Sequence, residues 1–348
     1  MARAVRRLRI LVLVHEELVP PASIAHLTDQ EADEFRTEFD VIQTLQRLGH
    51  EVRPVGIGDS LTTLRTEITE WKPHVCFNLL EEFGGIVTYD QHVVAYLELM
   101  RQAYTGCNPR GMMLSRDKVL SKQILSYHRI PTPKFALFRR GRRARAPRRL
   151  RYPLFVKSAT EDASLGIAQA SVVEDEARLL ERIEFIHEQT RSDALVEEFV
   201  EGREIYVGVV GNERLTVLPP WELTFGTPDA AALGIATRKA KWDRAYQARH
   251  AIVTGPARDL PAGAAEALAR LTRRIYRALH MSGYARMDFR MRPDGSLFVL
   301  EANANPNLAA QEDLGQAAKH AGIGYRRLVE RIVSLGMAYR AEWRDTAA

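Results

Sequence analysis

The sequence predicts a parallel α/β domain followed by an α+β region. Strands and helices alternate over the first hundred residues, and this order predicts a parallel sheet with ligand groups at the carboxyl ends of its strands. After residue 108 the order changes to hairpins and separate helices, so we place a boundary there. The chain has 348 residues, 46% hydrophobic and 27% charged, which is typical of a soluble globular protein of two or three domains.

The first part follows a strand–helix–strand order throughout. Continuous apolar runs predict strands, and amphipathic runs ended by glycine or proline predict helices. The expected strands lie at residues 8–15, 51–57 and 74–80, with a short edge segment at 103–106. The expected helices lie at residues 33–50, 60–73 and 88–102.

The second part mixes hairpins with helices. The expected strands lie at residues 134–138, 152–157, 168–172, 193–200 and 205–210, the last followed by a Gly-Asn hairpin turn. The first expected helix begins at residue 115 and is ended by Pro131 and Pro133. Two further helices are expected at residues 174–190 and 262–280. Residues 224–255 show no clear pattern, and a loop of that length is usually a functional lid or disordered.

Neither a membrane span nor a disulfide framework is expected. The apolar run at the N-terminus covers only Ile10 to Val14 before His15 and two glutamates follow, which is too short for a bilayer. The two cysteines, Cys76 and Cys107, fit a reducing cytoplasm. We therefore expect a cytoplasmic protein without a membrane partner.

Acidic side chains follow two of the predicted parallel strands. His15, Glu16 and Glu17 end the first strand, and Glu81 and Glu82 follow the third. Two such clusters at neighbouring strand ends suggest a site for a cation or a substrate amine. Ordinary solvated loop acids explain them equally well.

A predicted hairpin near the C-terminus places two carboxylates opposite each other. Asp294-Gly295 is a strong signal for a two-residue hairpin turn, and with this register Asp288 faces Glu301 while Arg286 faces Asn303. Opposed carboxylates about 5 Å apart repel each other unless a cation lies between them. Oxygen ligands without histidine or cysteine favour Mg²⁺ or Mn²⁺.

An alternative is an exposed pair neutralised by Arg286 or Arg290. The apolar flank at residues 297–300 argues against exposure, so we favour the metal site.

Two lysines are candidates for phosphate binding. Lys157 ends an apolar strand and precedes a loop of small and hydroxylated residues at 158–166, while Lys118 lies early in a helix. The chain contains neither a G-x-x-x-x-G-K-[ST] nor a G-x-G-x-x-G motif, which argues against P-loop and dinucleotide sites.

Taken in order, these motifs resemble the ATP-grasp superfamily, and within it the D-alanine–D-alanine ligases and their relatives. The matching segments span nearly the whole chain and are "LELMRQAYTG", "SRDKVLSK", "YPLFVKSATEDASLGI", "LVEEFVEGRE", "RKAKW", "ARMDFRMRPDGSLFVLEANANP" and "AAKHAGIGYRRLVERIV". The resemblance implies an ATP-grasp fold behind an N-terminal Rossmann-like substrate domain at 1–108. A central ATP-grasp subdomain would cover 109–199, and a C-terminal subdomain with the magnesium and acyl-phosphate site 200–348.

The resemblance also implies roles for individual residues. Arg286 would stabilise charge on an acyl phosphate, Lys241 would reach the γ-phosphate, and Asn307 stands in the oxyanion region. The implied metal ligands are Asp288, Glu301 and Asn303. The implied phosphate contacts are Lys118 and Lys157, with Glu161 and Ser164 in the phosphate loop. Around adenine the implied contacts are Phe155, Glu197, Glu198, Phe199, Val200 and Leu300. Glu204 is the implied contact of the ribose.

The implied reaction is amide formation at the expense of ATP. A carboxylate attacks the γ-phosphate to give an acyl phosphate and ADP, and an amine then displaces phosphate. ATP and Mg²⁺, or Mn²⁺, are the implied cofactors, and a small carboxylate and an amine the implied substrates. Relatives are often dimers through the N-terminal domain, which makes a homodimer an expectation.

Several positions depart from the D-alanine–D-alanine ligase pattern. The phosphate loop reads Glu161-Asp162-Ala163-Ser164 where the family has Glu-Gly-Ser-Ser, and Asn307 replaces a glycine of the oxyanion hole. "LAAQEDLG" replaces the serine-bearing segment that holds the second D-alanine, and "HEELVPP" replaces a Gly-rich turn. We therefore expect a carboxylate–amine ligase whose substrates are not the D-alanine pair. The alternatives are a true D-alanine–D-alanine ligase and a non-catalytic ATP-binding protein.

The positive charge of the chain is local. Residues Arg139–Arg151 contain eight arginines, and removing eight charges from the net charge of +5 leaves −3 for the remainder. Such a run is usually a solvated loop. No aromatic residues interleave with it, so nucleic-acid binding is the less favoured interpretation.

Overall fold

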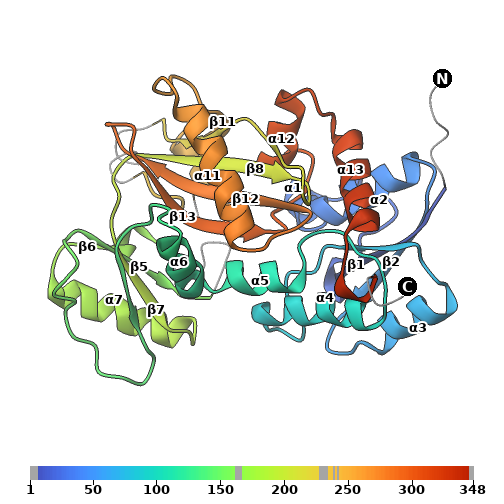
Figure 1. Ribbon diagram of the computed structural model, residues 1–348, viewed down its shortest axis with the longest axis horizontal. Helices are drawn as coiled ribbons and strands as arrows, with labels where there is room; N and C mark the ends of the chain where they lie inside the picture. The colour runs from blue at the N-terminus through green and yellow to red at the C-terminus, as the bar shows by residue number, and fades with distance from the viewer. Residues whose placement is uncertain (1–6, 161–166, 227–233, 238–239, 241–242, 345–348) are drawn as a thin grey trace.

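The computed structural model describes residues 7–160, 167–226, 234–237, 240 and 243–344. Its elements are built around three sheets (Figure 1). One three-stranded sheet is parallel, with the order β2-β1-β3. The other two sheets are antiparallel, with four strands in the order β4-β7-β5-β6 and six strands along the path β11-β10-β8-β12-β13 with β9 beside β8.

The parallel sheet confirms the predicted alternation of strands and helices. Its strands are β1 (Arg9–His15), β2 (Glu51–Ile57) and β3 (Val75–Asn78), and the expected edge segment is a single bridge between Cys76 and Tyr104. The surrounding helices are α1 (Asp29–Glu34), α2 (Arg36–Arg47), α3 (Thr62–Glu70) and α4 (Asp90–Leu99), with short 3-10 turns η1 (Glu16–Leu18) and η2 (Val87–Tyr89). All side chains of β1 between its two end residues are buried, as its unbroken apolar run predicts.

Two helices replace the single helix that was predicted from residue 115. These are α5 (Pro109–Arg116) and α6 (Lys118–Tyr127). Asn108 caps α5, with proline at the first helical position, and the Asp117 side chain accepts hydrogen bonds from the N–H groups of Val119 and Leu120 at the start of α6. The aspartate therefore ends one helix and starts the next, and Lys118 becomes the first residue of α6.

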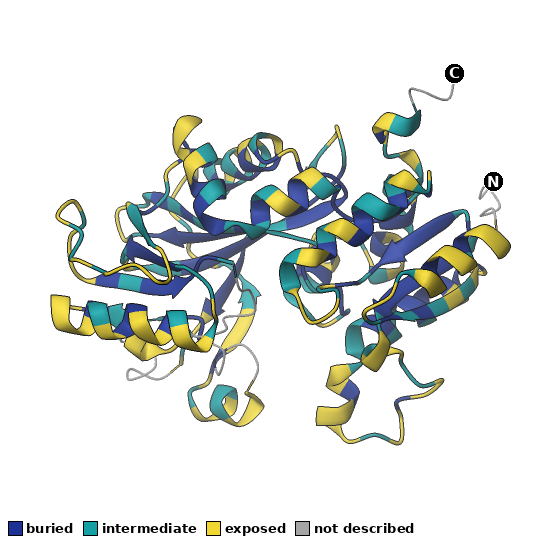
Figure 2. Ribbon diagram, turned by 90° about the horizontal axis from the view of Figure 1, so that it is seen from below, coloured by how far each residue is buried: buried dark blue, intermediate teal, exposed yellow. Residues whose placement is uncertain are grey.

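The four-stranded sheet carries one long helix. Its strands are β4 (Phe135–Phe138), β5 (Leu154–Ser158), β6 (Val172–Val173) and β7 (Ala194–Glu198), with α7 (Glu176–Gln189) packed on β5. The strand predicted at 168–172 is wrong in most of its length, because a 3-10 turn, η3 (Gln169–Ser171), precedes the two residues of β6. Figure 2 shows the exposed outer face of α7 and the buried strands behind it.

The six-stranded sheet forms the centre of the molecule. Its strands are β8 (Arg203–Val210), β9 (Thr216–Val217), β10 (Trp221–Thr224), β11 (Val253–Pro256), β12 (Tyr284–Met291) and β13 (Leu297–Ala304). The accompanying helices are α10 (Arg244–Arg249), α11 (Ala264–Ala278), α12 (Asp313–His320) and α13 (Tyr325–Ala338), followed by the short turn η4 (Glu342–Arg344). Residues 224–255 are thus not a structureless loop, since they include α10 and most of β11. The predicted Gly-Asn turn is longer, because Val210 pairs with Thr216.

The two faces of this sheet pack against different helices. Met287 and Phe289 join the core that includes Leu268 and Ile275 of α11, whereas Tyr206 and Tyr284 join the core beneath α12 and α13. Asp288 alternates with Met287 and Phe289 along β12 and so belongs to the Tyr206 face. None of the described helices is long and apolar enough to cross a membrane.

Candidate active site

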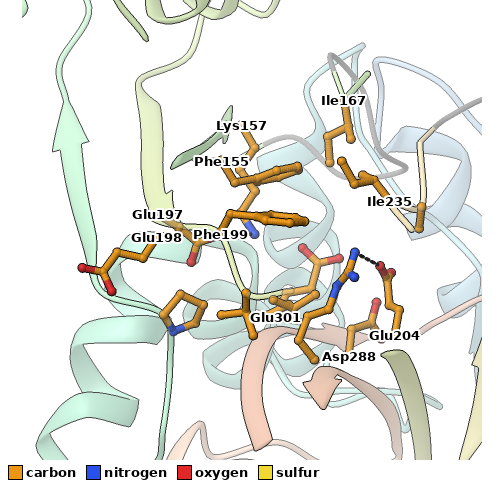
Figure 3. A pocket seen from close by; sticks show the side chains of 15 residues that line it. Phe155, Lys157, Ile167, Glu197, Glu198, Phe199, Glu204, Ile235, Asp288 and Glu301 are labelled. Carbon is orange, nitrogen blue, oxygen red and sulfur yellow. Dashed lines mark hydrogen bonds and ion pairs between the residues drawn. The ribbon is translucent and has the colours of Figure 1, made fainter. Parts of the chain in front are cut away.

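The main candidate site is a pocket between the four-stranded and six-stranded sheets (Figure 3). β5 and β7 supply one wall, and β8, β12 and β13 supply the other. The lining residues are Pro133, Phe155, Lys157, Ile167, Glu197, Glu198, Phe199, Val200, Glu204, Ile235, Ala236, Asp288, Arg290, Leu300 and Glu301. The structure thus brings together most of the residues that were predicted for ATP and metal binding.

One end of the pocket is apolar and flat. The rings of Phe155 and Phe199 are stacked, with centroids 6.5 Å apart and planes 26° from parallel (Figure 3). Leu300 of β13 also lines the pocket. The Arg290 guanidinium lies 5.7 Å from the Phe199 ring. This surface suits a planar aromatic group with polar edges.

A buried carboxylate between two lysines lies beside the apolar end. Glu197 is 2% exposed, and its two oxygens lie 2.5 Å from Lys122 Nζ and 3.0 Å from Lys157 Nζ. Burial raises the pKa of Glu197, but the charges of both lysines outweigh that effect and the pKa is lowered overall. The carboxylate is therefore ionised.

Lys122 was missed by the sequence reasoning. It lies four residues after Lys118 in α6, so both lysines share one face of the helix, and this spacing was the available signal. Its Nζ also donates a hydrogen bond to the carbonyl oxygen of Leu300 over 2.9 Å. Burial lowers the pKa of Lys122, although the charge of Glu197 opposes that effect.

The predicted carboxylate pair is present in the antiparallel ladder of β12 and β13. Asp288 lies opposite Glu301, and Arg286 lies opposite Asn303. The predicted two-residue turn is wrong, because Met291 pairs with Leu297 and three residues, Pro293–Gly295, form the turn. A β-bulge corrects the offset, since Asp288 pairs with residue 301 and Phe289 with residue 299, which leaves Leu300 unpaired in the ladder.

Each carboxylate of the pair has its own cation. Arg286 binds Asp288 through two hydrogen bonds of 2.8 and 3.0 Å, and Lys118 Nζ lies 3.8 Å from Glu301. Burial opposes the charge of Arg286, yet the neighbouring Asp288 raises the arginine pKa well above its usual value. Arg286 therefore neutralises Asp288, as the alternative interpretation of an exposed pair expected. Asp288 is not exposed, however, since only 2% of it is accessible.

The oxygen-rich ligand set fits Mg²⁺ held jointly with phosphate. The described residues contain no cluster of three His, Cys, Asp or Glu side chains placed for a metal, so the site offers two carboxylates and one amide. The Asn303 Nδ2 atom is buried and has no hydrogen-bond partner among the described residues, so this amide N–H group is available to donate to an acceptor such as a phosphate oxygen. Mg²⁺ typically takes one or two protein carboxylates and completes its shell with phosphates and water.

Glu204 of β8 lines the wall that the six-stranded sheet supplies. Its Oε2 accepts a hydrogen bond of 3.0 Å from Arg290, and its Oε1 accepts one of 2.8 Å from the Tyr206 hydroxyl. The predicted ribose contact stays a prediction, and Arg290 is a further pocket residue for which sequence gave no role beyond a neutralising charge.

One predicted residue has other surroundings, and three cannot be placed. The Asn307 side-chain oxygen accepts two hydrogen bonds, one from the Thr37 hydroxyl of α2 and one from the Ala309 N–H. Each has a donor–acceptor distance of 2.8 Å. Lys241 and the phosphate-loop residues Glu161 and Ser164 lie outside the described residues.

The acidic strand ends form a separate region at the parallel sheet. His15 Nε2 lies 3.4 Å from Glu82, while Glu16 packs against Gly58 and the Glu81 carbonyl accepts a hydrogen bond from Arg116. The N–H of Glu17 donates to His15 Nδ1. None of these five residues lines the pocket between the other two sheets, so their predicted contact with a substrate stays a prediction.

Sequence reasoning missed Glu38 of α2 in this region. It is 6% exposed, and burial together with the charge of Glu81 raises its pKa to about 7. A smaller cavity lies between the N-terminal helices and β13, where Asp90 of α4 and Ser115 and Arg116 of α5 line it together with Asn303.

The fold and site together define an ATP-grasp protein, with two antiparallel sheets that enclose a pocket of lysines and paired carboxylates. Residues 124–334 match the family described as "D-ala D-ala ligase C-terminus". The chain belongs to the D-alanine–D-alanine ligase family and is an ADP-forming ATP-grasp ligase.

Similar proteins cover nearly the same length. An uncharacterized protein, y4sG, of Sinorhizobium fredii is 34% identical over 86% of this chain and 87% of its own length. A D-alanine–D-alanine ligase of Nitratidesulfovibrio vulgaris is 34% identical over 81% of this chain and 91% of its own.

Solved structures support the fold. The D-alanine–D-alanine ligase of Bacillus anthracis complexed with ATP has a TM-score of 0.73 at 22% identity and covers 98% of this chain and 100% of its own. The VanG D-Ala:D-Ser ligase of Enterococcus faecalis has a TM-score of 0.70 at 19% identity and covers 95% of this chain and 100% of its own.

Proposed function

We propose that this protein is an ATP- and Mg²⁺-dependent carboxylate–amine ligase that works through an acyl phosphate and whose substrates are not a pair of D-alanines. The observation that carries the specificity part is Asn307. Where the family has a glycine, this chain has a side chain whose oxygen accepts a hydrogen bond from Thr37 of α2. That contact occupies space beside the hairpin of β12 and β13 and joins this hairpin to the N-terminal region.

The ATP part of the proposal is supported by the pocket. The aromatic wall of Phe155 and Phe199 would take adenine, Glu197 and the backbone up to Val200 would meet its polar edge, and Glu204 would bind the ribose. Lys118 and Lys157 would bind the phosphates. Bound Mg²⁺, or Mn²⁺, would neutralise phosphate charge and would be held by Asp288, Glu301 and Asn303.

The chemical steps follow from these positions. A substrate carboxylate oxygen attacks the γ-phosphorus, the bond to the ADP oxygen breaks, and an acyl phosphate forms. The amine nitrogen then attacks the acyl carbon, loses a proton, and phosphate leaves. Arg286 would stabilise the negative charge that develops beside the hairpin, because its position in β12, two residues from Asp288, places it next to the proposed metal ligands.

The substrate side of the proposal is assigned to the acidic strand ends. His15, Glu16, Glu17, Glu81 and Glu82 would meet a substrate amine or another cationic group. The altered segments around residues 15–21 and 307–315 belong to this side, which is why we propose a changed substrate pair.

The test is ADP release from purified protein with ATP, Mg²⁺ and a panel of amino acids and amines. We expect turnover with at least one pair and little with D-alanine alone. Strong turnover with D-alanine would identify a true D-alanine–D-alanine ligase. Tight ATP binding without turnover on any pair would indicate a non-catalytic nucleotide-binding protein.

A further inference from the structure

The buried group of Lys122, Glu197 and Lys157 contains one more cation than phosphate binding needs. We propose that Lys122 is a positioning residue that holds Glu197 ionised and in place while Lys157 moves to the phosphates of ATP. This inference rests on the proposed ATP binding. It assigns separate tasks to two lysines that touch the same carboxylate.

The two lysines differ in how firmly they are held. Lys122 Nζ has three partners, the Glu197 carboxylate at 2.5 Å, the Leu300 carbonyl at 2.9 Å and the Val299 carbonyl at 3.5 Å. Lys157 Nζ has, among the described residues, an ion pair with Glu197 alone, at 3.0 Å. Lys157 is thus free to exchange one anion for another, whereas Lys122 is fixed between α6, β7 and the bulge in β13.

Burial makes this exchange costly unless a second cation stays behind. Exposure is 1% for Lys122, 5% for Lys157 and 2% for Glu197. A buried charge that loses its partner is strongly destabilised. When Lys157 turns to a phosphate, Lys122 leaves Glu197 with one remaining ion pair.

An ionised Glu197 also matters for recognition. As a carboxylate it accepts hydrogen bonds only, which suits the amino group at the edge of adenine. If the lysine were absent, Glu197 would either hold Lys157 back from the phosphate or take up a proton. Both outcomes weaken ATP binding.

The experiment compares Lys122→Met, Glu197→Gln and the double variant. Methionine keeps the length of the side chain but removes its charge, and glutamine keeps the shape of the acid. We expect Lys122→Met to raise the dissociation constant of ATP by about tenfold or more. We expect the double variant to recover most of that loss, because glutamine keeps an acceptor oxygen for the adenine amino group and no buried carboxylate remains to be neutralised. Lys134→Met is the matched control, since that lysine side chain is 65% exposed and faces Glu198 at 3.8 Å.

A second measurement separates charge from packing. In Lys122→Met, ATP binding should weaken more steeply with rising pH than in the parent protein, because Glu197 must then take up a proton when Lys157 leaves. The groups that face Glu197 are Lys122 from α6 and Lys157 from β5, and Glu301 and Glu204 act on Lys157 from the opposite sheet.

The outcomes are distinct. Unchanged ATP affinity in Lys122→Met would overturn the inference. So would a loss that Glu197→Gln fails to recover, because Lys122 would then act only through the Leu300 carbonyl and packing. Absence of ATP binding in the parent protein would instead refute the proposed function.

Discussion

The proposed nucleotide pocket and the acidic end of the parallel sheet differ in whether their buried carboxylates have basic partners. In the pocket, four described carboxylates each have a basic partner: Glu197, Glu204, Asp288 and Glu301. At the parallel sheet, Glu38 is buried near another acid, and its pKa rises to about 7. The comparison suggests a pocket whose charges are balanced before ligand arrives and a substrate side that a cationic group would balance.

The largest effect is expected where the proposed metal ligand is changed. Asp288→Asn should lower ADP release about a thousandfold, because the amide cannot supply the charge that holds Mg²⁺ between the hairpin and the phosphates. Removal of divalent ions with a chelator should have the same effect on the parent protein. Asp294→Asn, a matched change in the exposed turn of the hairpin, should leave turnover within about twofold. Equal activity of Asp288→Asn and the parent protein would contradict the proposed metal site.

The next effect concerns the balanced charges themselves. Arg290→Met should lower the free energy of unfolding by about 3 kcal/mol, because Glu204, which is 7% exposed, loses its partner in the interior. Denaturant unfolding measures the change. The double variant with Glu204→Gln should regain most of the loss, and Arg292→Met, which removes a cation stacked on Phe298, should cost less than about 1 kcal/mol.

A smaller effect of opposite sign is expected at the acidic end. The folded state raises the pKa of Glu38 from 4.5 to about 7, so the folded chain holds a proton that the unfolded chain has released in this window. The stabilisation from this group is present below about pH 4.5 and is lost as the pH rises through about 7. Glu38→Gln should therefore be about 2 kcal/mol more stable than the parent protein at pH 8, and the difference should shrink at pH 5.

Unfolding in urea at both values measures this difference. The exposed Glu34→Gln on the preceding helix is the matched control and should change the unfolding free energy by no more than about 0.5 kcal/mol. A Glu38→Gln variant that is less stable at pH 8 would mean that the acid already has a compensating cation, and the contrast between the two regions would fail.

The smallest effect is expected in the arginine run. All eight arginines are exposed, and none of them has an ion pair among the described residues. Replacing Arg142, Arg143, Arg148 and Arg149 by serine should change the unfolding free energy by no more than about 0.5 kcal/mol and leave ADP release unchanged. A salt-dependent binding to RNA that disappears in this variant would instead give the run a partner.

The metal hairpin shows how far sequence reasoning reaches. The period of two along a strand placed Asp288 opposite Glu301 without any structural information, and the structure confirms that pairing. The turn was wrong by one residue, and the pairing survived only because the bulge at Leu300 corrects the offset. A bulge depends on contacts across the sheet, which local sequence does not show.

Lys122 and Glu38 show where it stops. Both lie on helices whose inward faces are apolar in pattern, and their partners come from distant strands or turns. Helix α5 was missed for a local reason. Its Asn-Pro-Arg-Gly start resembles a turn, whereas in the structure the Asn108 side chain caps a helix. Tertiary contacts, rather than propensity, decide such positions.

The bulge at Leu300 also has a mechanical consequence. Because this residue leaves the strand ladder, its carbonyl can accept a hydrogen bond from Lys122 of α6, and the same ammonium group binds Glu197 of β7. One lysine therefore links the six-stranded sheet to the four-stranded sheet at the pocket. An irregular step in one strand thus supplies part of the connection between the two sheets.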